Sequence, residues 1–290
     1  MSVFCPQKSC FRTSSPKIVR KGRFYRSSDH QKIQRFLCLH CKKSFSQATG
    51  NPCWGQKKRH INELLKQLLC SGVSMRRAAR ILRIHRITVA RKLEFLGKES
   101  LHKSSESMVQ FGPIREIQFD ELETFEHTQC KPLSVVMAVL PRTRKIVGFE
   151  VASMQSKGPL ASISRRRYGF RRDQRSQALG SLLKSLKPHV LNPVTFISDS
   201  NPHYPSQIQR FFPTAQHIKV FGRRGCGTGP GELKSGGFDP LFSLNHTFAM
   251  LRANINRLIR RTWCTTKKPE ALKNHLALYV DYHNSVLTEA

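Results

Sequence analysis

Two aspartates stand where buried strands are expected to end, and their side chains could share metal ions. Asp120 follows the apolar stretch 114–119, and Asp199 follows 194–198. If these strands are neighbours, the two carboxylates meet at one edge of the sheet and could bind divalent cations. Two such cations suit in-line displacement at a phosphodiester, because one activates the attacking oxygen and the other stabilises the leaving oxygen. Each residue alone also has an ordinary interpretation, as a strand-end acid or a turn residue.

Four cysteines near the N-terminus have the spacing of a structural zinc site. Cys5 and Cys10 form one close pair, and Cys38 and Cys41 form the second after 27 intervening residues. Two such pairs joined by a hairpin can present four thiolates to a tetrahedral Zn²⁺. His40 and Cys53 are alternate donors, and incidental reduced cysteines are the competing interpretation. So small a module has almost no apolar core, so the metal would supply its folding free energy.

The elements that must position the two aspartates follow residue 113 and have the periodicity of strands. Strands are predicted at 114–120, 133–140, 145–153, 194–199 and 217–222, with helices at 176–188, 243–262 and 268–284. A hairpin-built sheet that gains parallel strands by helical crossovers is an α/β arrangement. The Arg-rich and Ser-rich segment 155–175 is expected to be a mobile basic loop.

Between the cysteines and the strands, the apolar spacing becomes helical. Ile61 and four leucines recur at helical intervals up to residue 69. Gly72 can adopt a positive φ before Ser74 caps the next helix. Three short helices rich in arginine favour a helix-turn-helix whose last helix enters the major groove. A plain three-helix bundle with a solvated basic face is the alternative. Residues 98–112 are polar and predict a linker.

Composition favours a nucleic-acid partner. The 290 residues contain 50 Lys and Arg against 18 Asp and Glu, a formal net charge of +32. Such an excess is typical of chains that neutralise phosphates. The nine cysteines are odd in number and no export signal is evident, which argues against a disulfide framework. No run of about 18 apolar residues is present, so we expect a cytoplasmic protein without membrane contact.

Several motifs, in this order along the chain, resemble a known family. They are the four-cysteine ribbon, the helix-turn-helix, DELETF (120–125), ISDSNPHY (197–204) and FSLNHTFAMLRANINRLIRRTWCTTKK (242–268). Together they resemble the bacterial insertion-sequence transposases of the DDE type, especially the IS-one group and its relatives. The resemblance implies an RNase H-like catalytic domain with a five-stranded mixed sheet, the first aspartate on strand one and the second after strand four. By this resemblance, Asp120 corresponds to the first catalytic acid of the family and Asp199 to the second, and both are expected to bind Mg²⁺ or Mn²⁺.

The third catalytic position departs from the family pattern. Family members place a glutamate near the start of the late helix, where this sequence has Asn245 and His246. His246 is the first choice for a third ligand, because imidazole can bind a divalent ion or move a proton. Asn245 and, from a glycine-rich loop, Glu232 are the alternates. A catalytically inactive copy is the remaining possibility.

The expected protein is a DNA transposase that binds the terminal inverted repeats of an insertion sequence and catalyses metal-dependent cleavage and strand transfer. The alternatives are an inactive, transposase-derived DNA-binding protein and a structure-selective nuclease. Its partner is double-stranded DNA, on which it acts as a homodimer or larger oligomer, associated with the bacterial nucleoid. The expected domains are a zinc ribbon (1–55), a helix-turn-helix (56–97), a linker (98–112) and an RNase H-like domain (113–290). The residues expected to contact DNA are Arg83, Arg86, Thr88, Arg91, Arg257, Arg260 and Arg261.

Overall fold

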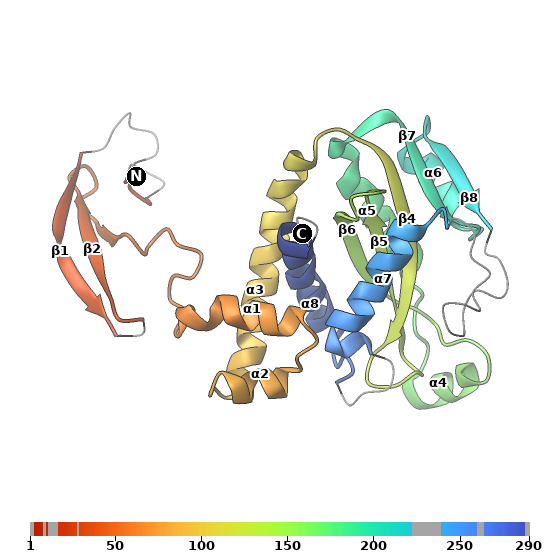
Figure 1. Ribbon diagram of the computed structural model, residues 1–290, viewed down its shortest axis with the longest axis horizontal. Coiled ribbons are helices and arrows are strands. Elements are labelled where there is room, and N and C mark those ends of the chain that lie inside the picture. Colours follow the sequence, from red (N-terminus) through yellow and green to blue (C-terminus); the bar gives the residue numbers. More distant parts are fainter. Residues whose placement is uncertain are drawn as a thin grey trace. The chain divides into compact units, whose positions relative to one another are not determined.

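The computed structural model divides the chain into two compact units, Met1–Leu64 and Leu65–Ala290, drawn in Figure 1. It describes residues 3–7, 10, 17–27, 29–221, 239–259 and 264–287. In this described part, no helix combines the length and the apolar character needed to cross a bilayer. Each unit has its own fold and is considered by itself.

The first unit is a small antiparallel sheet with very little core. Its strands are β1 (Ile18–Arg26), β2 (Gln31–Cys38) and β3 (Ser44–Ser46), in the order β1-β2-β3. The buried cluster beside this sheet consists of cysteine side chains, with Ile18 and Phe45 packed against it. Such a cluster removes little apolar surface from water, so burial alone gives this unit little stability.

Three helices follow the small sheet, the first of which begins just before the second unit, and the predicted turn conformation between the first two is confirmed. They are α1 (Asn62–Cys70), α2 (Met75–Ile81) and α3 (Arg86–Ser107). Gly72 has a φ of 75°, a conformation that L side chains rarely adopt. The Ser74 hydroxyl accepts a hydrogen bond from the Arg77 N–H at 3.3 Å and caps α2.

The predicted linker at 98–112 is wrong, because α3 continues through it to Ser107 and a 3₁₀ turn follows at Met108–Phe111. Small residues explain the continuation. Gly97 and Ser100 are buried against α8 (Pro269–Tyr282), the last long helix. The Ser100 hydroxyl lies 3.4 Å from a carboxylate oxygen of Asp281, which also pairs with Lys66 at 2.6 Å. The polar composition of this segment therefore reflects its solvent face.

The sheet of the second unit has five strands in the order β6-β5-β4-β7-β8. The β4-β5 and β5-β6 pairs are antiparallel, whereas β4-β7 and β7-β8 are parallel. This mixed sheet, with its first strand at the centre and its fourth strand beside it, fits the predicted RNase H-like arrangement. The strand bounds are β4 Ile114–Phe125, β5 Pro132–Val139, β6 Ile146–Ser153, β7 Val190–Asp199 and β8 Gln216–Val220.

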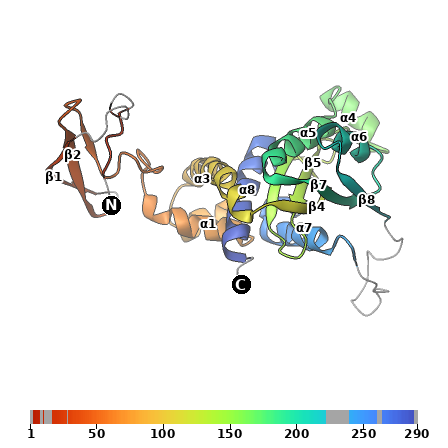
Figure 2. The same cartoon turned by 90° about the horizontal axis from the view of Figure 1, so that it is seen from above.

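Helices cover both faces of the sheet (Figure 2). One face packs against α5 (Arg175–Leu186) and α6 (Tyr204–Phe211), and the other against α7 (Phe242–Asn254) and α8. The core on the α7 and α8 face is continuous with the buried side chains of α1, α2 and α3. These three helices therefore share a hydrophobic core with the sheet.

Two basic segments differ from their predicted structures. The supposed mobile loop at 155–175 contains a helix, α4 (Leu160–Tyr168), with Ser164 buried and bonded to the Cys130 carbonyl at 2.6 Å. The predicted helix 243–262 ends early, because α7 stops at Asn254 and a 3₁₀ turn occupies Asn256–Leu258.

We expect Gly97→Ala to lower the free energy of unfolding of the second unit by about 3 kcal/mol. An added Cβ would lie 2.4 Å from the Asn274 carbonyl oxygen, so α3 and α8 would have to separate. Gly180→Ala in α5 is the matched control, since its Cβ would meet side chains and no backbone: the Phe211 ring at 3.3 Å and the Gln207 amide oxygen at 3.6 Å. Urea denaturation followed by circular dichroism measures both variants. Equal midpoints for Gly97→Ala and wild type would contradict the close packing of these helices.

We expect the stability of the second unit to fall below pH 6.5 because of His275. Its Nε2 lies 2.9 Å from the Leu69 carbonyl oxygen, and burial lowers the pKa of the ring to about 3. Between that value and 6.5, the unfolded chain binds more protons than the folded one, so stability decreases as pH falls. The loss between pH 7 and pH 5 is about 2 kcal/mol.

His275→Gln is the comparison for this prediction, because its side-chain amide can still donate to Leu69 but does not titrate. Denaturation midpoints of both proteins at pH 7 and pH 5 isolate the contribution of His275 from those of other groups. A wild-type pH dependence retained in the variant would show that His275 is not its source.

Candidate functional site

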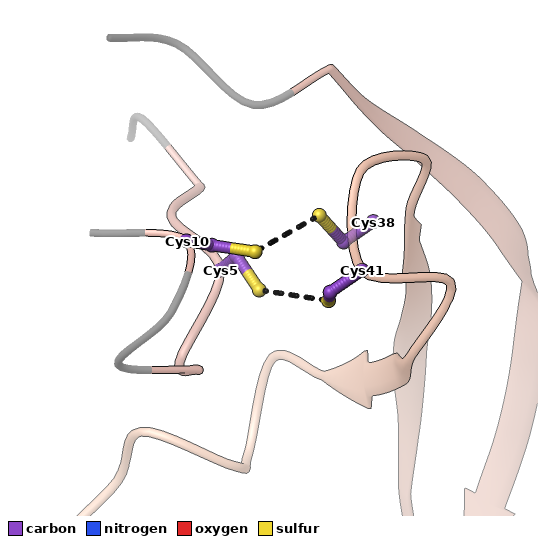
Figure 3. A group of neighbouring side chains, drawn as sticks. All are labelled: Cys5, Cys10, Cys38 and Cys41. Carbon is purple, nitrogen blue, oxygen red and sulfur yellow. Dashed lines mark hydrogen bonds between the residues drawn. The ribbon is translucent and has the colours of Figure 1, made fainter. Parts of the chain in front are cut away.

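The four predicted zinc ligands come together in the first unit. Cys38 ends β2, Cys41 lies on the turn that follows, and Cys5 and Cys10 come from the N-terminal segment. The Sγ atoms of Cys5 and Cys41 are 3.7 Å apart, those of Cys10 and Cys38 are 3.8 Å apart, and all four lie within 4.8 Å of one another (Figure 3). A tetrahedron of sulfurs about 2.3 Å from a zinc ion has edges of about 3.8 Å. The donor set therefore fits Zn²⁺.

Electrostatics in this cluster also suit a cation. Hydrogen bonding from the Cys41 backbone N–H, with a further contribution from His40, lowers the pKa of the Cys38 thiol to about 7. Burial raises the pKa of Cys10 to about 12 and also raises that of Cys5. Four thiolates at this separation need a divalent ion to offset their charge. Of the alternate donors, His40 places Nδ1 3.5 Å from Cys10 Sγ, whereas Cys53 contacts Asn62 outside the cluster.

Asp120 and Asp199 occupy equivalent register positions on neighbouring parallel strands. The last residue pair between β4 and β7 is Gln118 with Ile197. Asp120 lies two residues after Gln118, and Asp199 lies two residues after Ile197. Because side chains alternate across a strand, both carboxylates belong to the face that Gln118 and Ile197 share. Asp120 does not end its strand as predicted. β4 continues to Phe125 because β5 pairs with it from Gln118 to Phe125, whereas the pairing with β7 stops at Gln118.

The two carboxylates are close enough to influence each other. Burial, followed by the negative charge of Asp199, raises the pKa of Asp120 to about 6. Two hydrogen bonds lower this pKa in part. The Glu121 N–H donates to Asp120 Oδ1 at 2.6 Å, and the Tyr204 hydroxyl donates to the same oxygen at 3.3 Å. Asp199 Oδ1 accepts a hydrogen bond from the Asn201 N–H at 3.1 Å. Both side chains are therefore held in fixed orientations.

The neighbouring glutamates of DELETF have ordinary partners. Glu121 accepts a hydrogen bond from the Ser134 hydroxyl at 2.7 Å and lies 3.9 Å from Arg175. Glu123 pairs with Lys157 at 3.0 Å. These acids balance basic residues on α5 and on the loop between β6 and α4. Of the acidic residues in this motif, Asp120 is the one whose position matches that of Asp199.

In the described part of the chain, His246 and Asn245 have partners other than Asp120 and Asp199. Both ring nitrogens of His246 lie 3.3 and 3.4 Å from Arg144 Nη1, and its ring packs against Phe242. Asn245 donates to Asp239 Oδ2 at 2.9 Å, and Glu232 lies outside the described residues. Within the described ranges, the four cysteines form the only cluster with three or more metal-binding side chains.

Sequence reasoning missed two residues that bear on the site. Tyr204 is only 1% exposed and orients Asp120, a role that its place in ISDSNPHY could have indicated. Asp239 is an acid just before α7, where its Oδ1 accepts from the Leu241 N–H at 2.9 Å. It precedes Asn245 by six residues, so it falls outside the helical positions where the family pattern places an acid.

The predicted DNA-contacting residues fall into three groups. Arg83, Arg86 and Arg91 are exposed, around the turn before α3 and along its first turns, and Thr88 is half-buried there. Arg257 is only 8% exposed and lies inside the protein. Arg260 and Arg261 lie outside the described residues. The exposed start of α3 is accessible to a DNA groove, as a recognition helix must be.

Comparisons with known proteins add little to this geometry. No family model and no curated protein matches the chain. Among solved structures, the chain is similar to the catalytic domain of the Mos1 mariner transposase, with 13% sequence identity, 68% of this chain and 94% of that chain covered, and a TM-score of 0.26. A TM-score of this size carries no argument about fold or activity. The interpretation of the site therefore depends on the strand order, the register and the positions of the side chains.

Proposed function

We propose that the protein is a DNA transposase of the DDE type, which binds the terminal inverted repeats of an insertion sequence and cuts and joins DNA strands. The observation that carries the proposal is the matched position of Asp120 and Asp199 on adjacent parallel strands, with a pKa of about 6 for Asp120. A carboxylate pair held together despite mutual repulsion is typical of a site for divalent cations. The net charge of +32 and the exposed arginines around α3 favour binding to the phosphates of DNA.

In this proposal the two aspartates hold Mg²⁺ or Mn²⁺, which when bound activates the attacking oxygen and stabilises the leaving oxygen of a phosphodiester. The protein supplies orientation. Among the described residues, the hydrogen bonds to Asp120 reach Oδ1, so Oδ2 is available for an ion. Tyr204 and the Glu121 N–H keep that carboxylate in place, and the ribbon and helix-turn-helix hold the DNA.

A supercoiled-plasmid assay tests the proposal. The plasmid carries the DNA that borders the coding sequence on both sides, and the protein is added with Mg²⁺ or Mn²⁺. We expect cleavage at the borders followed by strand-transfer products. Cleavage without joining would instead identify a structure-selective nuclease, and specific binding without cleavage would identify a DNA-binding protein.

The inactive DNA-binding protein is the second candidate function, and one observation favours it. No third metal-binding side chain accompanies Asp120 and Asp199 in the described part of the chain. Asp239 lies shortly before α7 and accepts a hydrogen bond from Asn245, although it is outside the helix where the family has its glutamate. If the wild-type protein cleaves the plasmid, Asp239→Asn tests this acid as the third ligand: lost cleavage assigns it, and unchanged cleavage excludes it.

A further inference from the structure

A cavity of about 560 Å³ lies inside the second unit, between the start of α2 and the segment that leads into α8. Four basic side chains line it, and no Asp or Glu is among its lining residues. They are Arg76 from α2, Arg257 from the 3₁₀ turn after α7, and Lys267 and Lys268 from the residues before α8. A strongly basic cavity attracts an anion.

Arg257 is the unusual member of this group, because its side chain is buried and, among the described residues, forms no ion pair with an Asp or Glu. It is 8% exposed, and within the described residues its Nη2 lies 3.9 Å from the Met75 sulfur. Burial lowers its pKa to about 10, so the guanidinium remains charged at neutral pH. Buried charges in proteins are normally paired with an opposite charge. An anionic partner from outside the chain would provide one.

The other charged groups around the cavity do not neutralise Arg257. Arg76, Lys267 and Lys268 are exposed at its rim. Glu94 on α3 pairs with Lys98 at 2.6 Å, and that hydrogen bond, with a smaller contribution from Lys268, lowers the pKa of the Glu94 carboxyl. His275 lines the cavity as well, and burial together with the charge of Arg257 keeps it neutral. The cavity therefore has a net positive charge.

We propose that this cavity binds a phosphate group of the DNA backbone, with the Arg257 guanidinium donating to its oxygens and the three rim cations around it. Guanidinium forks match phosphate oxygens well. The assignment of DNA as the source of the phosphate rests on the proposed function, whereas the phosphate site itself does not. Because both α2 and the elements flanking α8 line the cavity, a bound phosphate would fix the DNA relative to the helix-turn-helix and the sheet domain together.

The test measures binding to a duplex of arbitrary sequence, without divalent ions, over a range of salt concentrations. Arg257→Met removes the charge and keeps much of the volume. Relative to wild type, it should bind on the order of tenfold more weakly at low salt, and the slope of log affinity against log salt should fall by about 1. Arg115→Met, at an exposed site on β4, is the matched control with the same charge change and should leave the slope unaltered.

Thermal melting verifies that Arg257→Met is folded, and if it is not, the double variant Lys267→Gln and Lys268→Gln takes its place. A wild-type salt slope in a folded variant overturns the DNA assignment. A second arm adds inorganic phosphate without DNA. Stabilisation of wild type but not of Arg257→Met, combined with an unchanged DNA slope, would identify a free phosphate as the occupant. If the protein binds DNA through this site but never cleaves it, the site stands and the proposed function fails.

Discussion

Replacing either Asp120 or Asp199 by Asn is expected to lower the rate of metal-dependent DNA cleavage by about 10³-fold or more. A bound cation contributes several kcal/mol to stabilising a phosphoryl transition state, and each 1.36 kcal/mol is a factor of ten in rate. An amide is a weaker ligand for hard cations than a carboxylate and brings no charge. DNA binding should remain, because the exposed arginines around α3 are untouched.

The same substitutions should leave the protein as stable as wild type or make it more stable. Asp120 is ionised at neutral pH despite burial and the nearby charge of Asp199, both of which oppose ionisation. In Asp120→Asn, the side-chain amide would keep an oxygen that accepts from Tyr204 and Glu121, without the charge. Loss of activity together with retained or increased melting temperature would distinguish a functional carboxylate from a structural one.

Glu123→Gln is the matched control for these variants, because it changes the same charge on the same strand. Glu123 pairs with Lys157 at 3.0 Å near the surface, and such exposed pairs contribute about 0–1 kcal/mol. Cleavage by Glu123→Gln at the wild-type rate is therefore expected. Metal-dependent cleavage that survives in both Asp120→Asn and Asp199→Asn would reject the site.

The strand-rich half of the chain was largely predictable because its signals are local. Alternation and short apolar runs located β5, β6 and β7 within a few residues, and a crossover helix between strands implied parallel pairing. That combination was enough to place Asp120 and Asp199 at adjacent register positions. The exact end of β4 was not predictable, since its last residues are held by β5 and not by their own composition.

The errors have a common physical origin in tertiary packing. In the sequence, Gly97 suggests the end of a helix. In the structure, the backbone of Asn274 on α8 packs so closely against Gly97 that no Cβ atom would fit between them. The arginines of 165–167 suggest a solvated loop, yet Ser164 and its hydrogen bond to Cys130 anchor a helix there. Burial of Arg257 was equally invisible, because its cavity is built from segments distant in the sequence.

Cys38→Ser is expected to remove bound zinc and unfold the first unit. Structural Zn²⁺ contributes about 10–16 kcal/mol of binding free energy in small zinc modules, and the described core here consists of the cysteines with few apolar neighbours. Zinc content by atomic emission should fall from one ion per chain to none, and limited proteolysis should cleave within residues 1–64. Cys53→Ser is the matched control, because Cys53 lies in the same unit but outside the cluster.

The second unit should survive the Cys38→Ser substitution, because the described residues of its two core clusters all lie at or after Leu65. Its melting transition is therefore expected at the wild-type temperature. This variant is more informative than a chelator, since a chelator would strip zinc and any catalytic magnesium together. If Cys38→Ser cleaves DNA non-specifically but no longer selects the element ends, the zinc site serves recognition. Full zinc content and protease resistance in the variant would exclude the four-cysteine site.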